Sequence, residues 1–349
     1  MNRQVPTLED VARVAGVSRS TVSRVVNGVR NVDPDIQAVV REAIARTGYV
    51  PNRAARTLVT RRSETIALVV SGAGENEGRE NGERDAFVTR VFADPFFGRV
   101  VSGVFGFLRP HDVHPLLLFV ESEEARAQAL DYLRQGGADG ALVVSTHPGD
   151  PLPTLLADED LPVVCFARPA LNAPVSYVDL AQRDGGRLAA EHLLSLGCRA
   201  VVTVAGPLDV PAGWERLAGF REGMERGGLP RAPFVEGSFT QESGEVAMSL
   251  LLNEHPDVDG VFAANDLMAR GVCETLRESG RTVPGDVVVV GFDDSSAALT
   301  CKPPLTTVRQ PVEDMAAAMA RLLLEHLHGE RSRPTSVIFE PELVVRVSA

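Results

Sequence analysis

The chain has 349 residues, of which 44% are hydrophobic and 23% are charged, a composition typical of soluble domains that bury a sizeable core. Its longest apolar runs, such as residues 116–120 and 287–290, fall far short of the roughly 20 residues that a membrane span requires. The N-terminus lacks the apolar stretch of a secretory signal, and the four cysteines lie far apart without a metal-binding pattern, so we expect a cytoplasmic protein with buried thiols.

The net charge of −12 hides two parts of opposite sign. Residues 1–63 contain 11 arginines and 5 acidic residues, a net charge of +6. The rest of the chain contains 24 basic and 42 acidic residues, a net charge of −18. A basic N-terminal part on an acidic body indicates that only the N-terminal part contacts a polyanion such as a nucleic acid.

Three short helices are predicted within the first 50 residues. The first begins at the capping residue Thr7 and ends at Gly16, the second begins after Ser18, and apolar residues recur in both at helical spacing. The third runs from Asp33 to Gly48. Because a tight turn containing glycine joins the first two, they form a helix-turn-helix, whose second helix enters the major groove of DNA. The outward-facing residues of that helix are Arg19, Ser20, Ser23, Arg24 and Asn27.

From residue 65 onward, runs of β-branched residues alternate with helical stretches, which predicts βαβ units around parallel sheets. The predicted strands are 66–70, 116–120, 141–145 and 163–166 in a first set and 200–205, 260–263 and 287–291 in a second, with helices near 182–196, 213–227, 242–253 and 265–279. Two open parallel sheets would place a ligand in a crevice at the carboxyl ends of their strands.

Several segments resemble the LacI/GalR family of repressors. TLEDVARVAGVSRSTVSRVVNG and GYVPNRAARTL are similar to the family's headpiece and hinge, and DPFFGRVVSGV, WERLAGFREGM, FAANDLMARGV and VPGDVVVVGFDD are similar to its periplasmic-binding-protein-like effector domain. The resemblance implies a small all-α headpiece over 1–50, a hinge helix over 51–63, and a two-lobed α/β effector and dimerisation domain over 64–349. It also implies three crossings, near residues 173, 309 and 333, which divide that domain into an N-lobe (64–173 and 310–333) and a C-lobe (174–309 and 334–349).

The resemblance implies DNA contacts in the headpiece and hinge. Arg19, Ser20 and Arg24 would read base edges, because arginine forks match the acceptors of guanine. Leu58 would insert into the minor groove from the hinge, where Ala55 also belongs to the expected interface. The residues expected to hold phosphates are Thr7, Ser18, Thr21, Ser23, Asn27, Tyr49 and Asn52. Two alternatives remain open: a basic domain that is merely solvated, and phosphate-only roles for Arg19 and Ser20.

In the effector domain, the resemblance implies a ligand cleft between the lobes. Charged and amide groups would bind hydroxyl groups, while aromatic rings would cover the apolar faces of a sugar. The expected effector-binding residues are Phe96, Phe97, Arg168, Trp214, Arg216, Phe239, Asn265 and Asp293. Phe96 and Phe97 can instead be core residues. Arg216 and Asp293 can form a purely structural pair, and Trp214 can merely pack.

Two features depart from the family pattern. Ala167 stands where many sugar-binding members have an aspartate, which removes an expected hydroxyl partner and leaves Arg168 as a partner for a charged group. Residues 71–85 form a polar, acidic insertion that we expect to be a surface loop, with a lid over the cleft as the alternative.

Other functions have less support in the sequence. No nucleotide-binding or catalytic motif follows a predicted strand, so we expect no catalytic residue, no metal and no cofactor. A solute-binding protein would need an export signal and no basic headpiece. An activator or a global regulator remains open. The resemblance implies a repressor that binds a pseudo-palindromic operator as a homodimer, with its affinity modulated by a sugar or a sugar derivative. The C-terminal segment reads as a strand without an added heptad helix, which favours a dimer over a tetramer.

Overall fold

The computed structural model describes residues 6–26, 32–50, 62–72, 84–145, 149–169, 173–229 and 232–349. Its first unit is a three-helix headpiece of α1 (Leu8–Ala15), α2 (Arg19–Val26) and α3 (Pro34–Thr47). Thr7 and Asp10 form the capping box of α1, and Gly16, with φ of 67°, ends that helix. Val11, Val22 and Val40 meet in a small core from which water is excluded. The predicted caps and the three predicted helices are confirmed.

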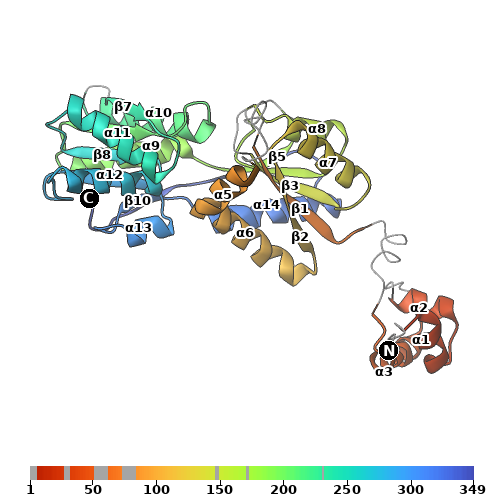
Figure 1. Ribbon diagram of the computed structural model, residues 1–349. Helices are drawn as coiled ribbons and strands as arrows, with labels where there is room; N and C mark the ends of the chain where they lie inside the picture. The colour runs from red at the N-terminus through yellow and green to blue at the C-terminus, as the bar shows by residue number, and fades with distance from the viewer. Residues whose placement is uncertain are drawn as a thin grey trace.

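The N-lobe is built on a parallel sheet of strand order β11-β5-β4-β3-β1-β2 (Figure 1). Its strands are β1 (Thr65–Ser71), β2 (His114–Val120), β3 (Gly140–Ser145), β4 (Val163–Phe166), β5 (Ser176–Leu180) and β11 (Ser336–Phe339). The helices around it are α5 (Arg84–Ala93), α6 (Pro95–Leu108), η1 (Arg109–His111), α7 (Glu123–Arg134), α8 (Leu152–Asp158) and α14 (Val312–Leu327). Successive side chains of β1 face opposite layers: Ile66 and Leu68 pack with α6 and α14, whereas Ala67 and Val69 pack with α7 and α8.

The C-lobe repeats this architecture with the strand order β12-β10-β9-β8-β6-β7. Its strands are β6 (Val201–Ala205), β7 (Phe234–Glu236), β8 (Gly260–Ala263), β9 (Val288–Asp293), β10 (Thr306–Arg309) and the antiparallel β12 (Glu342–Val344). Its helices are α9 (Gln182–Ser195), α10 (Pro211–Arg226), α11 (Gln241–Glu254), α12 (Asp266–Glu278) and α13 (Ser296–Thr300). Phe220 of α10 packs against one side of the sheet and Met268 of α12 against the other.

The chain passes between the two sheets three times, as predicted, but two of the crossings lie later than predicted. Because β5 and β11 belong to the first sheet, the crossings follow residues 180, 309 and 339 rather than 173, 309 and 333. Both strands are short and carry polar residues, so they lack the continuous apolar run that marked the other strands. Of the insertion 71–85, residues 73–83 lie outside the described residues, and α5 begins at Arg84.

Helix α14 runs from the crossing region to the start of the effector domain. Its first turn carries Glu313, and the carbonyl of its last residue, Leu327, accepts a hydrogen bond of 2.7 Å from Nη2 of Arg62. Its apolar side, including Met315 and Met319, is completely buried against the sheet. This helix therefore connects Glu313, near the crossing after residue 309, with Arg62 at the end of the predicted hinge.

The cysteines are buried free thiols, as predicted from the sequence. They are Cys165, Cys198, Cys273 and Cys301. Among the described residues, no single helix is long and apolar enough to cross a membrane; only the bent pair 87–93 and 95–111, with an angle of 79° between its parts, reaches the required length and composition. In that pair Val100, Val104 and Leu108 are buried inside the N-lobe.

Candidate functional site

Arg216 occupies the centre of a polar cluster at the carboxyl ends of the C-lobe strands. It projects from α10 and is only 5% exposed. Its Nε donates to Oε1 of Gln182 at 2.8 Å, its Nη1 to the carbonyl of Ala264 at 2.6 Å, and its Nη2 to Oε1 of Gln310 at 2.9 Å. Its guanidinium also lies 3.7 Å from the ring centre of Phe292, within cation–π range. The arginine is therefore fixed before any ligand arrives.

Close helix packing places Arg216 in this position. A Cβ atom at Gly186 of α9 would lie 2.1 Å from the carbonyl oxygen of Arg216, and one at Gly219 of α10 would lie 1.8 Å from the carbonyl of Arg183. Only glycine lets the two helix backbones approach this closely. This close packing brings the start of α10 onto the strand ends, where Arg216 reaches Asp293 and Ala264.

Asp293 at the end of β9 provides the carboxylate that faces Arg216. Its Oδ1 lies 3.3 Å from Nη1 of Arg216. Burial raises the pKa of Asp293 to about 7, although the charge of Arg216 opposes the rise. Its backbone has φ of 103° and that of Asp294 has φ of 52°, values that side-chain-bearing residues adopt rarely. Such strained backbone is typical of ligand sites, where surrounding contacts hold it in place.

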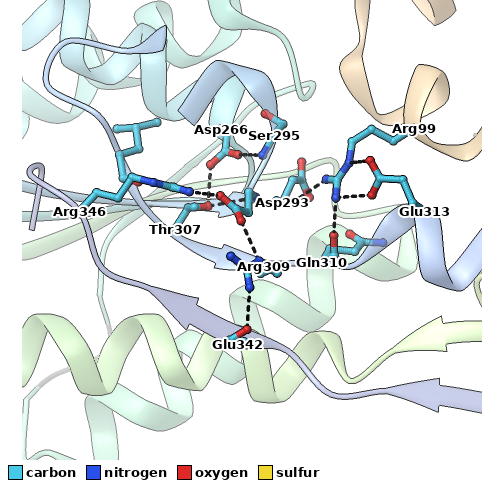
Figure 2. A network of polar contacts seen from close by, with 12 residues as sticks. Arg99, Asp266, Asp293, Ser295, Thr307, Arg309, Gln310, Glu313, Glu342 and Arg346 are labelled. Atoms are coloured by element: carbon cyan, nitrogen blue, oxygen red, sulfur yellow. Dashed lines mark hydrogen bonds and ion pairs between the residues drawn. The ribbon is translucent and has the colours of Figure 1, made fainter. Parts of the chain in front are cut away.

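An arginine of the N-lobe reaches the same segment from the other side (Figure 2). Arg99 of α6 donates from Nη1 to the carbonyl of Asp293 at 2.8 Å and from Nη2 to the carbonyl of Gln310 at 3.0 Å. It also makes a forked pair with both carboxylate oxygens of Glu313, each at 2.8 Å, which lowers the pKa of Glu313. Gln310 thus contacts both arginines, one through its side chain and one through its backbone.

Three more carboxylates surround the arginine. Burial raises the pKa of Asp266 to about 6, against hydrogen bonds from Thr307 at 2.6 Å and from the N–H of Ser295 at 2.7 Å. Burial also raises the pKa of Asp94 and of Asp179. An arginine with fixed partners among carboxylates of raised pKa supplies both donors and acceptors, as a polyhydroxylated ligand requires.

The headpiece presents a second cluster of polar groups. Ser18 lies 2.8 Å from the hydroxyl oxygens of both Ser20 and Thr21 and caps α2 through the N–H of Thr21. Arg19 is 69% exposed and pairs with Glu9 of α1 at 3.0 Å, while Arg24 is exposed on the same helix. Of the other predicted DNA contacts, Thr7 is exposed at the start of α1, Ser23 is half-buried, and Tyr49 packs against the headpiece core. Asn27, Asn52, Ala55 and Leu58 lie outside the described residues.

Comparison with known proteins now decides the family. Residues 7–52 match the lacI family of bacterial regulatory proteins, and residues 190–349 match the periplasmic binding protein-like domain. The chain is 45% identical to the HTH-type transcriptional regulator CelR of Thermobifida fusca over 351 residues, which cover 99% of each chain. The chain belongs to the LacI family of bacterial regulatory proteins. The predicted family and fold class are confirmed.

Other LacI-family proteins match over almost the whole length. The ribose operon repressor of Escherichia coli (strain K12) is 30% identical, with 98% of this chain and 99% of that protein covered. Among solved structures, a CelR–cellobiose complex matches with a TM-score of 0.74 and 42% identity, over 99% of this chain and 100% of that one. A lac repressor dimer bound to operator and an anti-inducer matches with a TM-score of 0.81 and 27% identity, over 99% of both chains.

Two of the predicted effector residues in this LacI-family protein, Asn265 and Phe239, are bonded to each other. Asn265 is buried at the start of α12, where its Oδ1 accepts from the N–H of Met268 and its Nδ2 donates to the carbonyl of Phe239, both at 2.9 Å. The backbone of Phe239 has φ of 62°, and its ring centre lies 6.0 Å from the Arg216 guanidinium. Asn265 therefore holds an aromatic ring beside the central arginine.

The predicted aromatic pair of the N-lobe, Phe96 and Phe97, packs at the edge of the core. The ring of Phe96 meets those of Phe97 and Phe166 edge-on, with centres 5.1 and 5.2 Å apart. Phe96 and Phe97 are half-buried and pack against the main core. Asp94, which caps α6 through the N–H of Phe96, places these rings next to the carboxylate cluster.

Arg168 and Trp214 make no direct contact with Arg216, although the backbone of Arg168 is bonded to Asp179 of the surrounding carboxylates. Arg168 is exposed, and its backbone N–H donates to Asp179 at 3.1 Å. Trp214 is 43% exposed and lines a pocket of about 360 Å³ together with Arg183, Leu208, Leu217, Ala218, Arg221, Glu222 and Glu225. An effector role for either residue stays a prediction.

Several residues of the site were not predicted from the sequence. These are Asp94, Arg99, Gln182, Asp266, Gln310 and Glu313. One signal was available, because Gln310 follows directly after β10 and Asp266 comes three residues after the end of β8, at the edge where parallel sheets bind ligands. Arg99 carries no such signal, since its partners lie about two hundred residues away in the chain.

Proposed function

We propose that this LacI-family protein is a cytoplasmic transcriptional repressor without enzymatic activity. Its headpiece would read a pseudo-palindromic operator through Arg19, Ser20 and Arg24, and Leu58 of the hinge would insert into the minor groove. The names of the relatives, which include an operon repressor and an operator-bound lac repressor, support this proposal. The basic headpiece on an acidic body supports it independently.

We infer further that the effector is a carbohydrate bound at Arg216 and Asp293. The observation that carries this inference is the buried Arg216 among carboxylates and amides, with the Phe239 ring beside it. Charged groups in a dry site make strong hydrogen bonds to hydroxyls, and an aromatic ring covers the apolar face of a sugar. The relative solved with cellobiose makes that disaccharide the first ligand to test. Ala167, which replaces an expected aspartate, weakens the case for a simple hexose.

We propose that the protein acts as a homodimer. The lac repressor relative is a dimer on its operator. The described residues include exposed apolar side chains on both lobes: Phe92 and Phe105 on α5 and α6, and Val246 and Leu250 on α11. Pairing of such faces would remove apolar area from water and would bring two headpieces to the two halves of an operator. Sedimentation of the intact protein at micromolar concentration tests this point, and a purely monomeric species would exclude it.

One experiment tests the regulator proposal as a whole. The intact protein is used to select binding sites from random double-stranded DNA, and the recovered sequences are compared. We expect a two-fold-symmetric consensus whose affinity falls steeply with salt, because many contacts go to phosphates. Titration of the selected complex with cellobiose and a panel of related sugars then tests the effector. Recovery of sequences without any preference would contradict the proposal.

A further inference from the structure

Arg99 of the N-lobe forms a hydrogen bond to the C-lobe at Asp293, the proposed effector-binding carboxylate. Its side chain is 18% exposed and comes from α6 of the N-lobe. Two of its hydrogen bonds end on backbone carbonyls at the edge of the C-lobe sheet, that of Asp293 at the end of β9 and that of Gln310 directly after β10. Its other two end on Glu313, at the start of α14. Each of these four bonds is between 2.8 and 3.0 Å long, so all three nitrogens of the guanidinium have a partner.

The segment that Arg99 holds has an unfavourable backbone conformation. Asp293 and Asp294 are consecutive residues with positive φ, and neither is glycine. Asp294 is fixed by its own carboxylate, which accepts hydrogen bonds from Arg309 at 2.8 Å and from Arg346 at 2.5 Å. The backbone carbonyl of Asp293 is held by Arg99, while its side chain turns to Arg216. A contact of this kind is needed to keep a rare conformation populated.

We propose that Arg99 is a positioning residue for effector binding, which holds the Asp293 backbone across the lobe boundary so that its carboxylate faces the ligand site. The proposal rests on the proposed function, in which Asp293 contacts a carbohydrate. Arg99 need not touch the ligand itself. Lysine cannot replace it fully, because an ammonium group lacks the planar fork that binds a carboxylate and two carbonyls together.

The test compares Arg99→Met, Arg99→Lys and a matched control, Arg134→Met. Arg134 makes the same forked pair, with Glu159, on the outer surface of the same lobe, at 3.1 and 2.6 Å. Cellobiose affinity is measured by calorimetry, and amide hydrogen exchange of residues 291–297 is measured without any sugar. We expect Arg99→Met to weaken cellobiose binding roughly 10- to 100-fold, the range for losing hydrogen bonds to a charged group. Arg99→Lys should be intermediate, and Arg134→Met should bind as the unmodified chain does.

A second readout separates positioning from mere stabilisation. Arg99 is one of the charges that lower the pKa of Asp293, together with Arg216, whereas Asp266 and Asp94 raise it. Loss of Arg99 should therefore move the acid limb of cellobiose binding to higher pH, and faster exchange of residues 291–297 should accompany this shift. Unchanged exchange in Arg99→Met would overturn the proposal whatever the ligand is. If the unmodified chain binds no sugar, the carbohydrate proposal fails, and the exchange data alone decide the role of Arg99.

Discussion

Asp139 accepts two hydrogen bonds from Ser63, one from its backbone N–H at 2.6 Å and one from its hydroxyl at 2.8 Å. The second oxygen of Asp139 accepts from the N–H of Glu64 at 2.9 Å. This carboxylate, which lies in the turn before β3, therefore fixes the residues that connect the hinge to β1.

Replacement of Asp139 by alanine should loosen this connection. The two backbone N–H groups would lose charged partners, so we expect a loss of about 1–3 kcal/mol in the free energy of unfolding by urea. Operator affinity should fall as well, because a mobile connection raises the entropy cost of ordering the hinge on DNA. Asp139→Asn keeps one acceptor oxygen, so its stability and its operator affinity should lie between those of the unmodified chain and those of Asp139→Ala. Equal operator affinity in all three proteins would argue against a role in DNA binding.

The raised pKa of Asp293 predicts an unusual pH dependence of stability. Its folded-state pKa of about 7 lies above the usual value of about 3.9 for unfolded aspartate, so the folded chain holds the proton more tightly. Stability from this group is present below the unfolded pKa and is lost as the pH rises through 7. The free energy of unfolding of Asp293→Asn, relative to that of the unmodified chain, should therefore be about 1–3 kcal/mol higher at pH 7.5 than at pH 5. Urea unfolding at the two pH values measures this difference, and a constant offset would show that Asp293 does not titrate in this range.

Glu9 should restrain DNA binding by holding Arg19. Both side chains are more than half exposed, so their 3.0 Å pair contributes little to stability. Glu9→Gln removes one negative charge from the headpiece and leaves Arg19 without its ion pair. We expect affinity for any duplex to rise a few-fold, about 1 kcal/mol or less, without a change in the melting temperature. Fluorescence anisotropy on random DNA gives the result, and a reduced affinity would mean that the pair instead pre-orients Arg19.

Arg24→Ala distinguishes base reading from phosphate binding. If Arg24 reads a guanine, its loss should cost about 1–3 kcal/mol on the selected operator and much less on random DNA. Affinities for both duplexes are measured at the same salt concentration. A loss of equal size on the two duplexes would assign Arg24 to the phosphate backbone.

The predictions from the sequence succeeded where the decisive interactions are local. Thr7, Asp10 and Gly16 determine both ends of α1 within ten residues. The apolar runs of β1 and β3 are continuous in the sequence and therefore predict buried strands directly. The failures concern residues whose environment depends on distant segments. Arg99 is an ordinary polar residue in the sequence, and only the folding of the two lobes makes it a neighbour of Gln310. Likewise, β5 and β11 become strands because they pair with each other at the edge of a sheet that the rest of the lobe supplies.

Arg216 shows how the structure changes an expectation about variants. If Arg216 served only to bind the effector, its truncation would weaken ligand binding and leave the fold intact. The side chain, however, fills a buried position with four hydrogen-bond partners, so its removal leaves Asp293 and Gln310 without their partner. Breaking a buried pair of this kind costs roughly 3–5 kcal/mol. A loss of ligand affinity in Arg216→Ala must therefore be read beside the urea unfolding curve of the same variant, because the truncation changes folding as well.

The course of α14 has a mechanical consequence. A helix of 16 residues is about 24 Å long, and as a packed rod it tilts rather than bends. One end is bonded to Arg99 through Glu313, and the other holds Arg62 through the Leu327 carbonyl. A tilt of only about 5° at the cleft would displace the far end by about 2 Å, similar to the small helix shifts that switch other proteins. A small rearrangement around Arg99, at the proposed effector site, would therefore be passed along the helix to Arg62, at the end of the predicted hinge.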